Sequence, residues 1–225
     1  IMNNLINEKY ILDTNKRLLI LGCEGHSKVV TDIAHSVGFN DIIYEDPNSI
    51  SNFFLGGKVF KSINEKFTGY FFVAIGDNFK REKVTEAFSN SNHKSRNISL
   101  IHPSSIISPR SLIGEGTVIM PLCVVNSCTE IGKGVIINTR SSIDHDNCLM
   151  NYSSIAPGVT TSGNVTVGER TFISIGTSVK HNINIGNDVV VGASSLVLKN
   201  ISNNEVFYGS PAKFIRKRNT GEKYL

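Results

Sequence analysis

An aliphatic residue recurs at every sixth position of the chain from Ile101 to Val197, and the phase never slips. The series is Ile101, Ile107, Ile113, Ile119, Val125, Ile131, Ile137, Ile143, Leu149, Ile155, Thr161, Val167, Ile173, Val179, Ile185, Val191 and Val197. Only Thr161 among these 17 residues is not Ile, Val or Leu. A small or β-branched residue follows four positions after each of them, with Asn147 as the one exception.

A period of six fits neither an α-helix nor the two-residue alternation of an ordinary strand. It is typical of a β-solenoid, in which three hexads complete one triangular coil. The aliphatic residue then fills the interior, and the small residue lies near a corner. Seventeen hexads give five to six coils of 18 residues, which stack to a prism about 27 Å tall. Because side chains fill a solenoid of this width, its chemistry must lie on the outside.

The first half of the chain has a different pattern. Residues 17–21, 41–44 and 70–75 are short apolar runs that we expect to form strands, and residues 27–37 and 79 to about 89 are expected helices. One face of the first helix would hold Val29, Val30, Ile33, Ala34 and Val37. Strand, glycine turn, helix and strand in this order predict a parallel sheet with a nucleotide-type crevice at its carboxyl edge.

The glycine turn at residues 22–26 lies between the first strand and the first helix. The amides at the helix N-terminus would therefore face a phosphate. Glu45 and Asp46 end the second strand, where ribose or base recognition usually falls in such folds. A tight turn followed by a solvated acidic loop accounts equally well for these residues, because glycine-rich turns occur in sheets of any function.

His145 is a candidate general base. It follows inward Ile143 by two residues, which directs it outward near a corner, and it has Asp144 and Asp146 on either side. A neighbouring carboxylate stabilises the imidazolium and raises the basicity of the ring. The alternative is a surface histidine in a polar turn.

A metal site at the same edge is a second hypothesis, because His181 lies two coils above His145 in the same register. Zinc requires three or four ligands, and no third His or Cys lies nearby in this phase. The cysteines, Cys23, Cys123, Cys128 and Cys148, lack metal-finger spacing. We therefore predict no metal and expect free thiols in a reducing cytoplasm.

Composition limits the possible partners. The net charge of +4 comes without an aromatic-interleaved basic patch, so we expect no nucleic-acid partner. Apolar runs such as residues 70–75 are too short to span a membrane, and the first 17 residues lack the apolar core of a secretory signal. Five cations between Lys213 and Lys223 could contact a phosphate-bearing cofactor or form a solvated end.

Several segments together resemble a known family. They are the glycine turn ending in Gly25-His26, Ile137-Asn138-Thr139, Ile143-Asp144-His145-Asp146, Ile155-Ala156-Pro157-Gly158, Ser162-Gly163-Asn164-Val165 and Gly209-Ser210-Pro211-Ala212-Lys213. From Arg17 to about Lys217 the chain resembles the bacterial nucleotide-sugar acetyltransferases of the left-handed β-helix superfamily. Sialic acid O-acetyltransferases share this layout.

The resemblance implies an α/β Rossmann-like domain followed by an all-β left-handed parallel β-helix. Expected boundaries are an N-terminal tail at 1–15, a nucleotide-sugar-binding domain at 16–97, the β-helix at 98–202 and a basic tail at 203–225. The implied reaction is acetyl-CoA-dependent N-acetylation of a UDP-, dTDP- or GDP-linked 4-amino-4,6-dideoxy sugar. The implied assembly is a cytoplasmic homotrimer with active sites between neighbouring solenoids.

The resemblance also implies roles for single residues. His145 would be the base and Asp146 the residue that raises its basicity. The substrate positions would be Glu24, Gly25, His26, Glu45, Asp46, Gly76 and Asn138. The acetyl-CoA positions would be Ser154, Gly163, Ile175 and Ala193. Ser154 replaces a histidine that often contacts the cofactor thioester in the family, so that contact must differ here.

Other functions remain open from the sequence. An O-acetyltransferase would use the same base on a sugar hydroxyl. A zinc hydro-lyase resembling the solenoid carbonic anhydrases lacks a third histidine and would not need the N-terminal domain. A non-enzymatic nucleotide-sugar-binding trimer would not need the pair His145 and Asp146 in the outward register.

Overall fold

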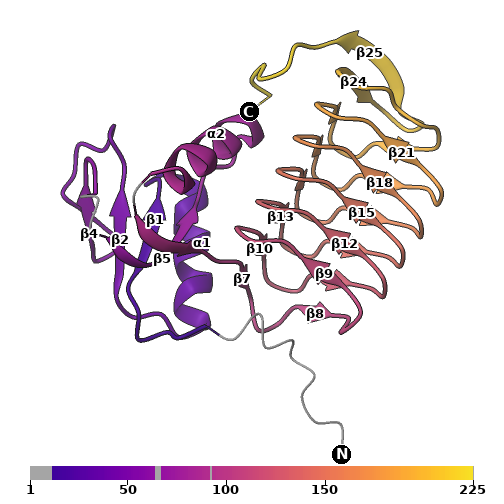
Figure 1. The fold of residues 1–225 in the computed structure, drawn as a ribbon. Helices are drawn as coiled ribbons and strands as arrows, with labels where there is room; N and C mark the ends of the chain where they lie inside the picture. Colours follow the sequence, from indigo (N-terminus) through magenta and orange to yellow (C-terminus); the bar gives the residue numbers. More distant parts are fainter. Residues whose placement is uncertain (1–11, 64–66, 92, 225) are drawn as a thin grey trace, which may run out of the picture.

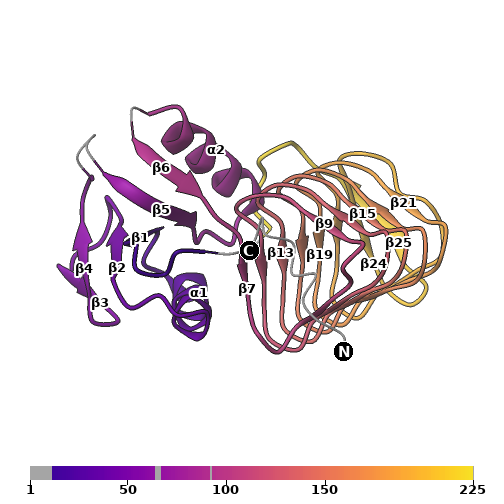
Figure 2. The same ribbon diagram turned by 60° about the horizontal axis from the view of Figure 1, so that its bottom comes forward.

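Each hexad of the repeat forms one two-residue strand, and each strand pairs in parallel with the strand 18 residues away, as Val118 does with Ile136. The computed structural model describes residues 12–63, 67–91 and 93–224. Figure 2 shows the coils obliquely, stacked one behind another in register, and three sheets of paired strands give each coil three sides. The predicted solenoid is confirmed.

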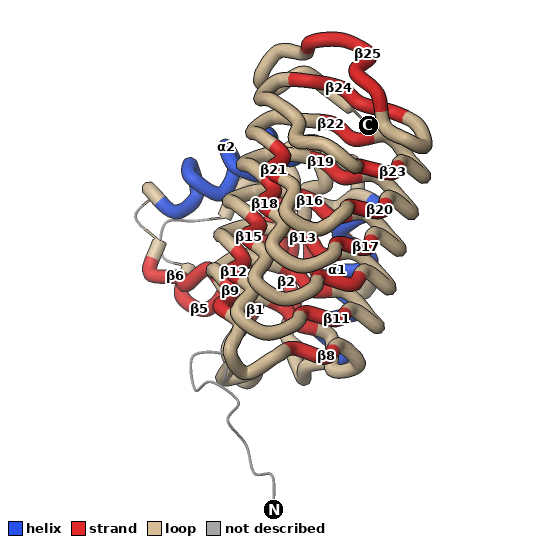
Figure 3. The backbone as a smooth tube through the Cα atoms, turned by 90° about the vertical axis from the view of Figure 1, so that its right-hand side faces the viewer, coloured by secondary structure: helices blue, strands red, loops and turns tan. Residues whose placement is uncertain are grey.

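The stacked strands form three faces of the prism, visible as columns in Figure 3. The first face contains β7 (Leu100–Ile101), β10 (Val118–Ile119), β13 (Ile136–Ile137), β16 (Ser154–Ile155), β19 (Phe172–Ile173) and β22 (Val190–Val191). The second contains β8 (Ile106–Ile107), β11 (Val124–Val125), β14 (Ser142–Ile143), β17 (Thr160–Thr161), β20 (Ser178–Val179) and β23 (Leu196–Val197). The third contains β9 (Leu112–Ile113), β12 (Glu130–Ile131), β15 (Cys148–Leu149), β18 (Thr166–Val167) and β21 (Asn184–Ile185).

Aliphatic side chains of the repeat fill the interior, and Ile137, Ile155 and Ile173 are fully buried. The small residues near the corners satisfy backbone carbonyls of the next coil. Thr117 Oγ1 donates to the Gly132 carbonyl, and Ser141 Oγ donates to the Ala156 carbonyl. Buried carbonyls need such partners, which explains why Ser and Thr occupy many of these positions.

The first face differs from the other two in its outward residues. Val118, Ile136 and Val190 point away from the interior and are nevertheless buried. The N-terminal domain and the C-terminal segment cover this face, as Figure 1 shows. Ser154 is the polar exception in this column, and it too is buried.

The N-terminal domain is a six-stranded sheet in the order β3 (Phe53–Phe54), β4 (Gly57–Phe60), β2 (Ile42–Glu45), β1 (Leu18–Leu21), β5 (Thr68–Val73) and β6 (Lys94–Asn97). β1 pairs in parallel with β2 and β5. Helix α1 (Gly25–Ser36) packs on the sheet face that continues into the solenoid core. Helix α2 (Asn78–Ser89) covers the opposite face through Phe88.

All five predicted elements of this domain are present, and none of their ends is shifted by more than two residues. The hairpin of β3 and β4 and strand β6 were not predicted. The assignment of Val29 to the buried face of the first helix was wrong, because its side chain is 38% exposed. Val30, Ile33 and Ala34 are buried in the core, and Val37 is partly buried against it.

The C-terminal segment closes the solenoid and returns to the N-terminal domain. β24 (Glu205–Tyr208) pairs with β22, and β25 (Lys213–Lys217) pairs with β24. The chain then runs back to α2 (Figure 1), where the Tyr224 ring lies 4.6 Å from that of Phe172. No helix in the described parts of the chain has the length and apolar character needed to cross a membrane.

Candidate active site

A cleft of about 340 Å³ lies between the N-terminal domain and the first face of the solenoid. It brings together five residues predicted for substrate or cofactor, namely His26, Gly76, Asn138, Ser154 and Ile175. The other lining residues are Ile136, Ile155, Ala156, Pro157, Phe172 and Ser174. The cleft therefore has a mainly apolar wall with a few polar groups, which is typical of a small-molecule site.

His26 is the titratable group of this cleft. Burial, with the nearby positive charge of Arg81, lowers its pKa to about 4, so the imidazole is neutral at physiological pH. Its Nε2 is buried and has no hydrogen-bond partner among the described residues. The unpartnered nitrogen of a neutral imidazole can donate or accept a hydrogen bond with a bound ligand, depending on the tautomer.

The remaining predicted substrate residues lie at the carboxyl ends of the central strands. Glu24 precedes α1, and its side chain makes no capping hydrogen bond. Gly25 is exposed, and an added Cβ there would contact nothing. Asp46 Oδ2 accepts from the Cys23 amide at 3.1 Å, which fixes the glycine turn to the end of β2.

The Glu45 side chain forms a hydrogen bond within the N-terminal domain. Its Oε2 accepts from the Ile63 amide at 2.8 Å, and burial raises the pKa of the carboxyl. This hydrogen bond holds the chain after β4 beside β2, so the side chain already has a partner.

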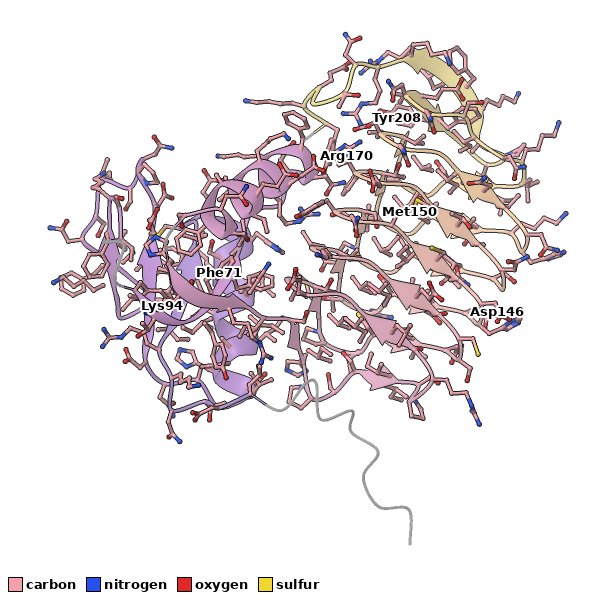
Figure 4. The ribbon with its side chains drawn as sticks, in the orientation of Figure 1. Phe71, Lys94, Asp146, Met150, Arg170 and Tyr208 are labelled. Carbon is pink, nitrogen blue, oxygen red and sulfur yellow. The ribbon has the colours of Figure 1, made fainter. Side chains whose placement is uncertain are left out.

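His145 and Asp146 lie at the corner between the second and third faces, away from the cleft. Figure 4 shows Asp146 at the edge of the solenoid opposite the N-terminal domain. His145 Nδ1 donates to Asp146 Oδ2 at 2.7 Å, because a carboxylate can only accept. This bond, followed by the charge of Asp144, raises the pKa of His145. Nε2 is then the basic nitrogen.

The two exceptions to the hexapeptide pattern lie beneath this turn. Asn147 Nδ2 donates to the carbonyls of Asp144, His145 and Ser162 at 2.9–3.0 Å. The Thr161 hydroxyl accepts from the Asp144 amide at 3.3 Å. The repeat is therefore broken where buried polar groups must hold the backbone that presents His145.

Gly163 lies one coil above His145 and makes room for its ring. A Cβ at residue 163 would be 2.5 Å from Cε1 of His145, so any side chain would displace the imidazole. Ala193, the fourth predicted cofactor residue, lies in a second hollow of about 290 Å³ beside Phe172, Tyr208 and Tyr224.

His145 and His181 do not form part of a metal cluster. Among the described residues, no three His, Cys, Asp or Glu side chains are grouped so that they could hold a metal ion.

Known proteins share both halves of this architecture. The family model described as the PglD N-terminal domain matches residues 17–88. A histidine-to-alanine mutant of GDP-perosamine N-acetyltransferase from Caulobacter crescentus, solved in complex with CoA and GDP-perosamine, is 31% identical with a TM-score of 0.81, and the match covers 89% of this chain and 97% of that one. The acetyltransferase domain of PglB from Neisseria gonorrhoeae FA1090, solved with acetyl coenzyme A, is 30% identical with a TM-score of 0.81. That match covers 89% of this chain and 99% of that one.

The chain belongs to the hexapeptide-repeat nucleotide-sugar N-acetyltransferases. A sequence relative in this family is the GDP-perosamine N-acetyltransferase of Escherichia coli O157:H7, 30% identical over 114 residues. That match covers 51% of this chain and 51% of the relative, so the chain spans about half the length of the curated relative. The predicted family and fold class are confirmed.

The residues that join the two domains were not predicted. Arg81 of α2 is 1% exposed and bonds to both the loop after β5 and the solenoid. Arg170 connects Asp188 of the solenoid to Glu82 of α2. The sequence does contain a signal for this docking. The outward residues of the first face, one in every third hexad, are apolar except for Ser154: they are Leu100, Val118, Ile136, Phe172 and Val190.

Replacing Asn147 tests whether it stabilises the turn of His145. Asn147→Ala removes the amide group that donates to the carbonyls of Asp144, His145 and Ser162 and should lower the free energy of unfolding by about 1–3 kcal/mol. Ser141→Ala, at the equivalent position of the preceding hexad, removes one bond and should cost about 1 kcal/mol or less. Urea denaturation of both variants measures the difference. Equal stability of the two would contradict this interpretation.

Proposed function

We propose that the chain transfers the acetyl group of acetyl-CoA to the 4-amino group of a nucleotide-linked 4-amino-4,6-dideoxy sugar. The main support is a relative that matches 89% of this chain and binds both CoA and GDP-perosamine. The nucleotide is UDP, dTDP or GDP. No metal takes part in the proposed reaction.

In this proposal His145 is the general base. A sugar amine is mostly protonated at neutral pH and must lose a proton before it can attack. His145 Nε2 accepts that proton while Asp146 holds the proton on Nδ1 and stabilises the imidazolium. General-base assistance of this kind contributes about 10²–10⁴ in rate.

The amine nitrogen then bonds to the thioester carbon, and a backbone N–H faces the developing oxyanion. When the tetrahedral intermediate collapses, the carbon–sulfur bond breaks and the imidazolium returns a proton to the thiolate of CoA. The neutral imidazole then takes the second proton from the acylated nitrogen, which leaves the amide, and releases that proton to solvent. Holding both reactants side by side accounts for much of the remaining acceleration. Cys148 is a poor nucleophile, because burial raises the pKa of its thiol, so transfer is direct.

The cleft binds the nucleotide sugar. Glu24, Gly25 and His26 hold the diphosphate at the N-terminus of α1, and Glu45, Asp46 and Gly76 surround the ribose and base. Asn138 stands close to the sugar. Ser154, Gly163, Ile175 and Ala193 lie along the acetyl-CoA path, with Gly163 leaving room beside His145.

A complete site needs more than one protomer in this proposal. The cleft lies against the N-terminal domain, whereas Asp146, the hydrogen-bond partner of His145, lies at the edge opposite that domain (Figure 4). Cyclic assembly brings the base corner of one copy to the cleft of the next. We therefore propose a homotrimer, located in the cytoplasm, where four free cysteines are expected.

CoA release tests the reaction directly. Wild type should release CoA from acetyl-CoA with one member of a panel of UDP-, dTDP- and GDP-linked 4-amino sugars, and His145→Ala should reduce the rate about 10²-fold or more. Sugar hydroxyl acceptors in the same panel test O-acetylation. Equal rates for the mutant would remove His145 from the mechanism, and no release with any amino sugar would overturn the proposed acceptor.

The pH dependence tests the pair. Because the base must be neutral, kcat should rise with pH through the pKa of His145, which lies above the ordinary histidine value. Asp146→Asn removes the main cause of that rise and should move the acidic limb to lower pH while lowering the plateau rate. Asp144→Asn, which removes the smaller effect, should move it less. An acidic limb that stays in place in Asp146→Asn argues against the pairing.

Mixed assemblies test the shared site. His145→Ala disables the base corner, and Ser174→Trp should fill the cleft, so each variant alone should be inactive. Random mixing of equal amounts should restore about one quarter of the wild-type sites, because some interfaces then combine two intact halves. If no activity returns in mixtures shown to contain both chains, each site is built from a single protomer.

A further inference from the structure

Arg81 has the most extensive side-chain hydrogen bonding of the interface between the two domains. It lies on α2 with 1% of its surface exposed. Nη1 donates to the carbonyls of Ile75 and Gly76 at 2.9 Å, and Nε donates to the Gly134 carbonyl at 2.8 Å. Nη2 faces the Asn78 amide oxygen, the carbonyls of Tyr152 and Ser153, and the Ser154 hydroxyl at 2.8–3.4 Å. One guanidinium thus joins the loop after β5 to two coils of the solenoid.

Arg81 has no direct counter-ion among the described residues, although the nearby charge of Asp77 favours its protonated form. Its seven acceptors are all uncharged, and no carboxylate in the described part of the chain forms an ion pair with it. Burial lowers its pKa to about 10, so it stays protonated at neutral pH. Arg170, the other arginine between the domains, has Glu82 and Asp188 as partners. Burying an unpaired cation is costly, which points to a role beyond domain docking.

Two of the residues bonded to Arg81 line the cleft. Gly76 is on the N-terminal side, and Ser154 is on the solenoid side. The guanidinium therefore lies directly behind the wall that a ligand would touch, and it sets the distance between the two sides. An anion in the cleft would offset a charge that no carboxylate contacts directly.

We propose that Arg81 is a positioning residue of the nucleotide half of the site, fixing the Ile75–Gly76 loop against the solenoid and placing a positive charge behind the cleft, near the diphosphate that Glu24, Gly25 and His26 would hold. The identity of this ligand rests on the proposed function. Ser154 serves the same arrangement. Its hydroxyl donates to Asn78 Oδ1 at 2.6 Å and accepts from Arg81, so the residue that replaces the family histidine belongs to the link between the domains.

Arg81→Met and Arg170→Met form a matched pair for the test. Both variants lose an arginine between α2 and the solenoid, and both should melt at lower temperature. Only Arg81→Met releases the Ile75–Gly76 loop. We expect it to weaken binding of the nucleoside diphosphate that wild type prefers among UDP, dTDP and GDP by about tenfold or more, against less than about threefold for Arg170→Met. Binding of the matching uncharged nucleoside should weaken less than that of the diphosphate.

Hydrogen exchange provides a readout that needs neither ligand nor activity. Amides 75–77 should exchange faster in Arg81→Met than in wild type and should be unchanged in Arg170→Met. Should Arg81→Met fail to fold, Arg81→Lys keeps the charge but cannot reach all three segments, and it should show the same faster exchange. Unchanged exchange in the folded Arg81 variant, or equal changes in the Arg170 variant, overturns the proposal.

Failure of the proposed reaction would be recognised separately. A protein that releases no CoA but binds a nucleoside diphosphate through Arg81 would refute the acetyl transfer and leave the positioning role supported. A protein that acetylates normally, with an unchanged KM for the nucleotide sugar in Arg81→Met, would support the acetyl transfer and refute the positioning role.

Discussion

Parallel pairing between residues 18 positions apart is the constraint on which the rest of this structure depends. Once Val118 pairs with Ile136, every coil repeats the same three strands and three corners. The interior then admits only side chains of fixed size, and each corner carbonyl must be satisfied from a neighbouring coil. Equivalent residues therefore form columns, and the position of a residue in the 18-residue period determines the face or corner of the solenoid on which it lies.

Departures from the repeat mark the places where the solenoid does more than support itself. Thr161 and Asn147 bring hydrogen-bonding groups under the turn of His145. Gly163 leaves space for the imidazole in the coil above. Ser154 interrupts an apolar outward column and bonds to Asn78 and Arg81. Each departure exchanges some packing for a polar contact or an open space at the candidate site.

The two domains meet through an apolar face with a polar centre. Val118, Ile136 and Val190 supply buried area, while Arg81 and Arg170 fix the orientation. Directional bonds to backbone carbonyls position a domain more narrowly than hydrophobic contact, which has no direction. The cleft lies at this junction, so its shape depends on the docking of the two domains and belongs to neither alone.

The sequence by itself determined the solenoid, because a six-residue period leaves no other regular structure for residues 101–197. It also determined that His145 points outward next to Asp146, because register follows from the same count. The tertiary structure alone decided that His26, Gly76, Asn138 and Ser154 share one cleft while His145 stands at another corner. It also decided that Arg81 bonds to residues more than 50 positions away. Periodicity fixes the neighbours within a repeat, whereas contacts between the non-repeating domain and the solenoid depend on how two finished surfaces fit together.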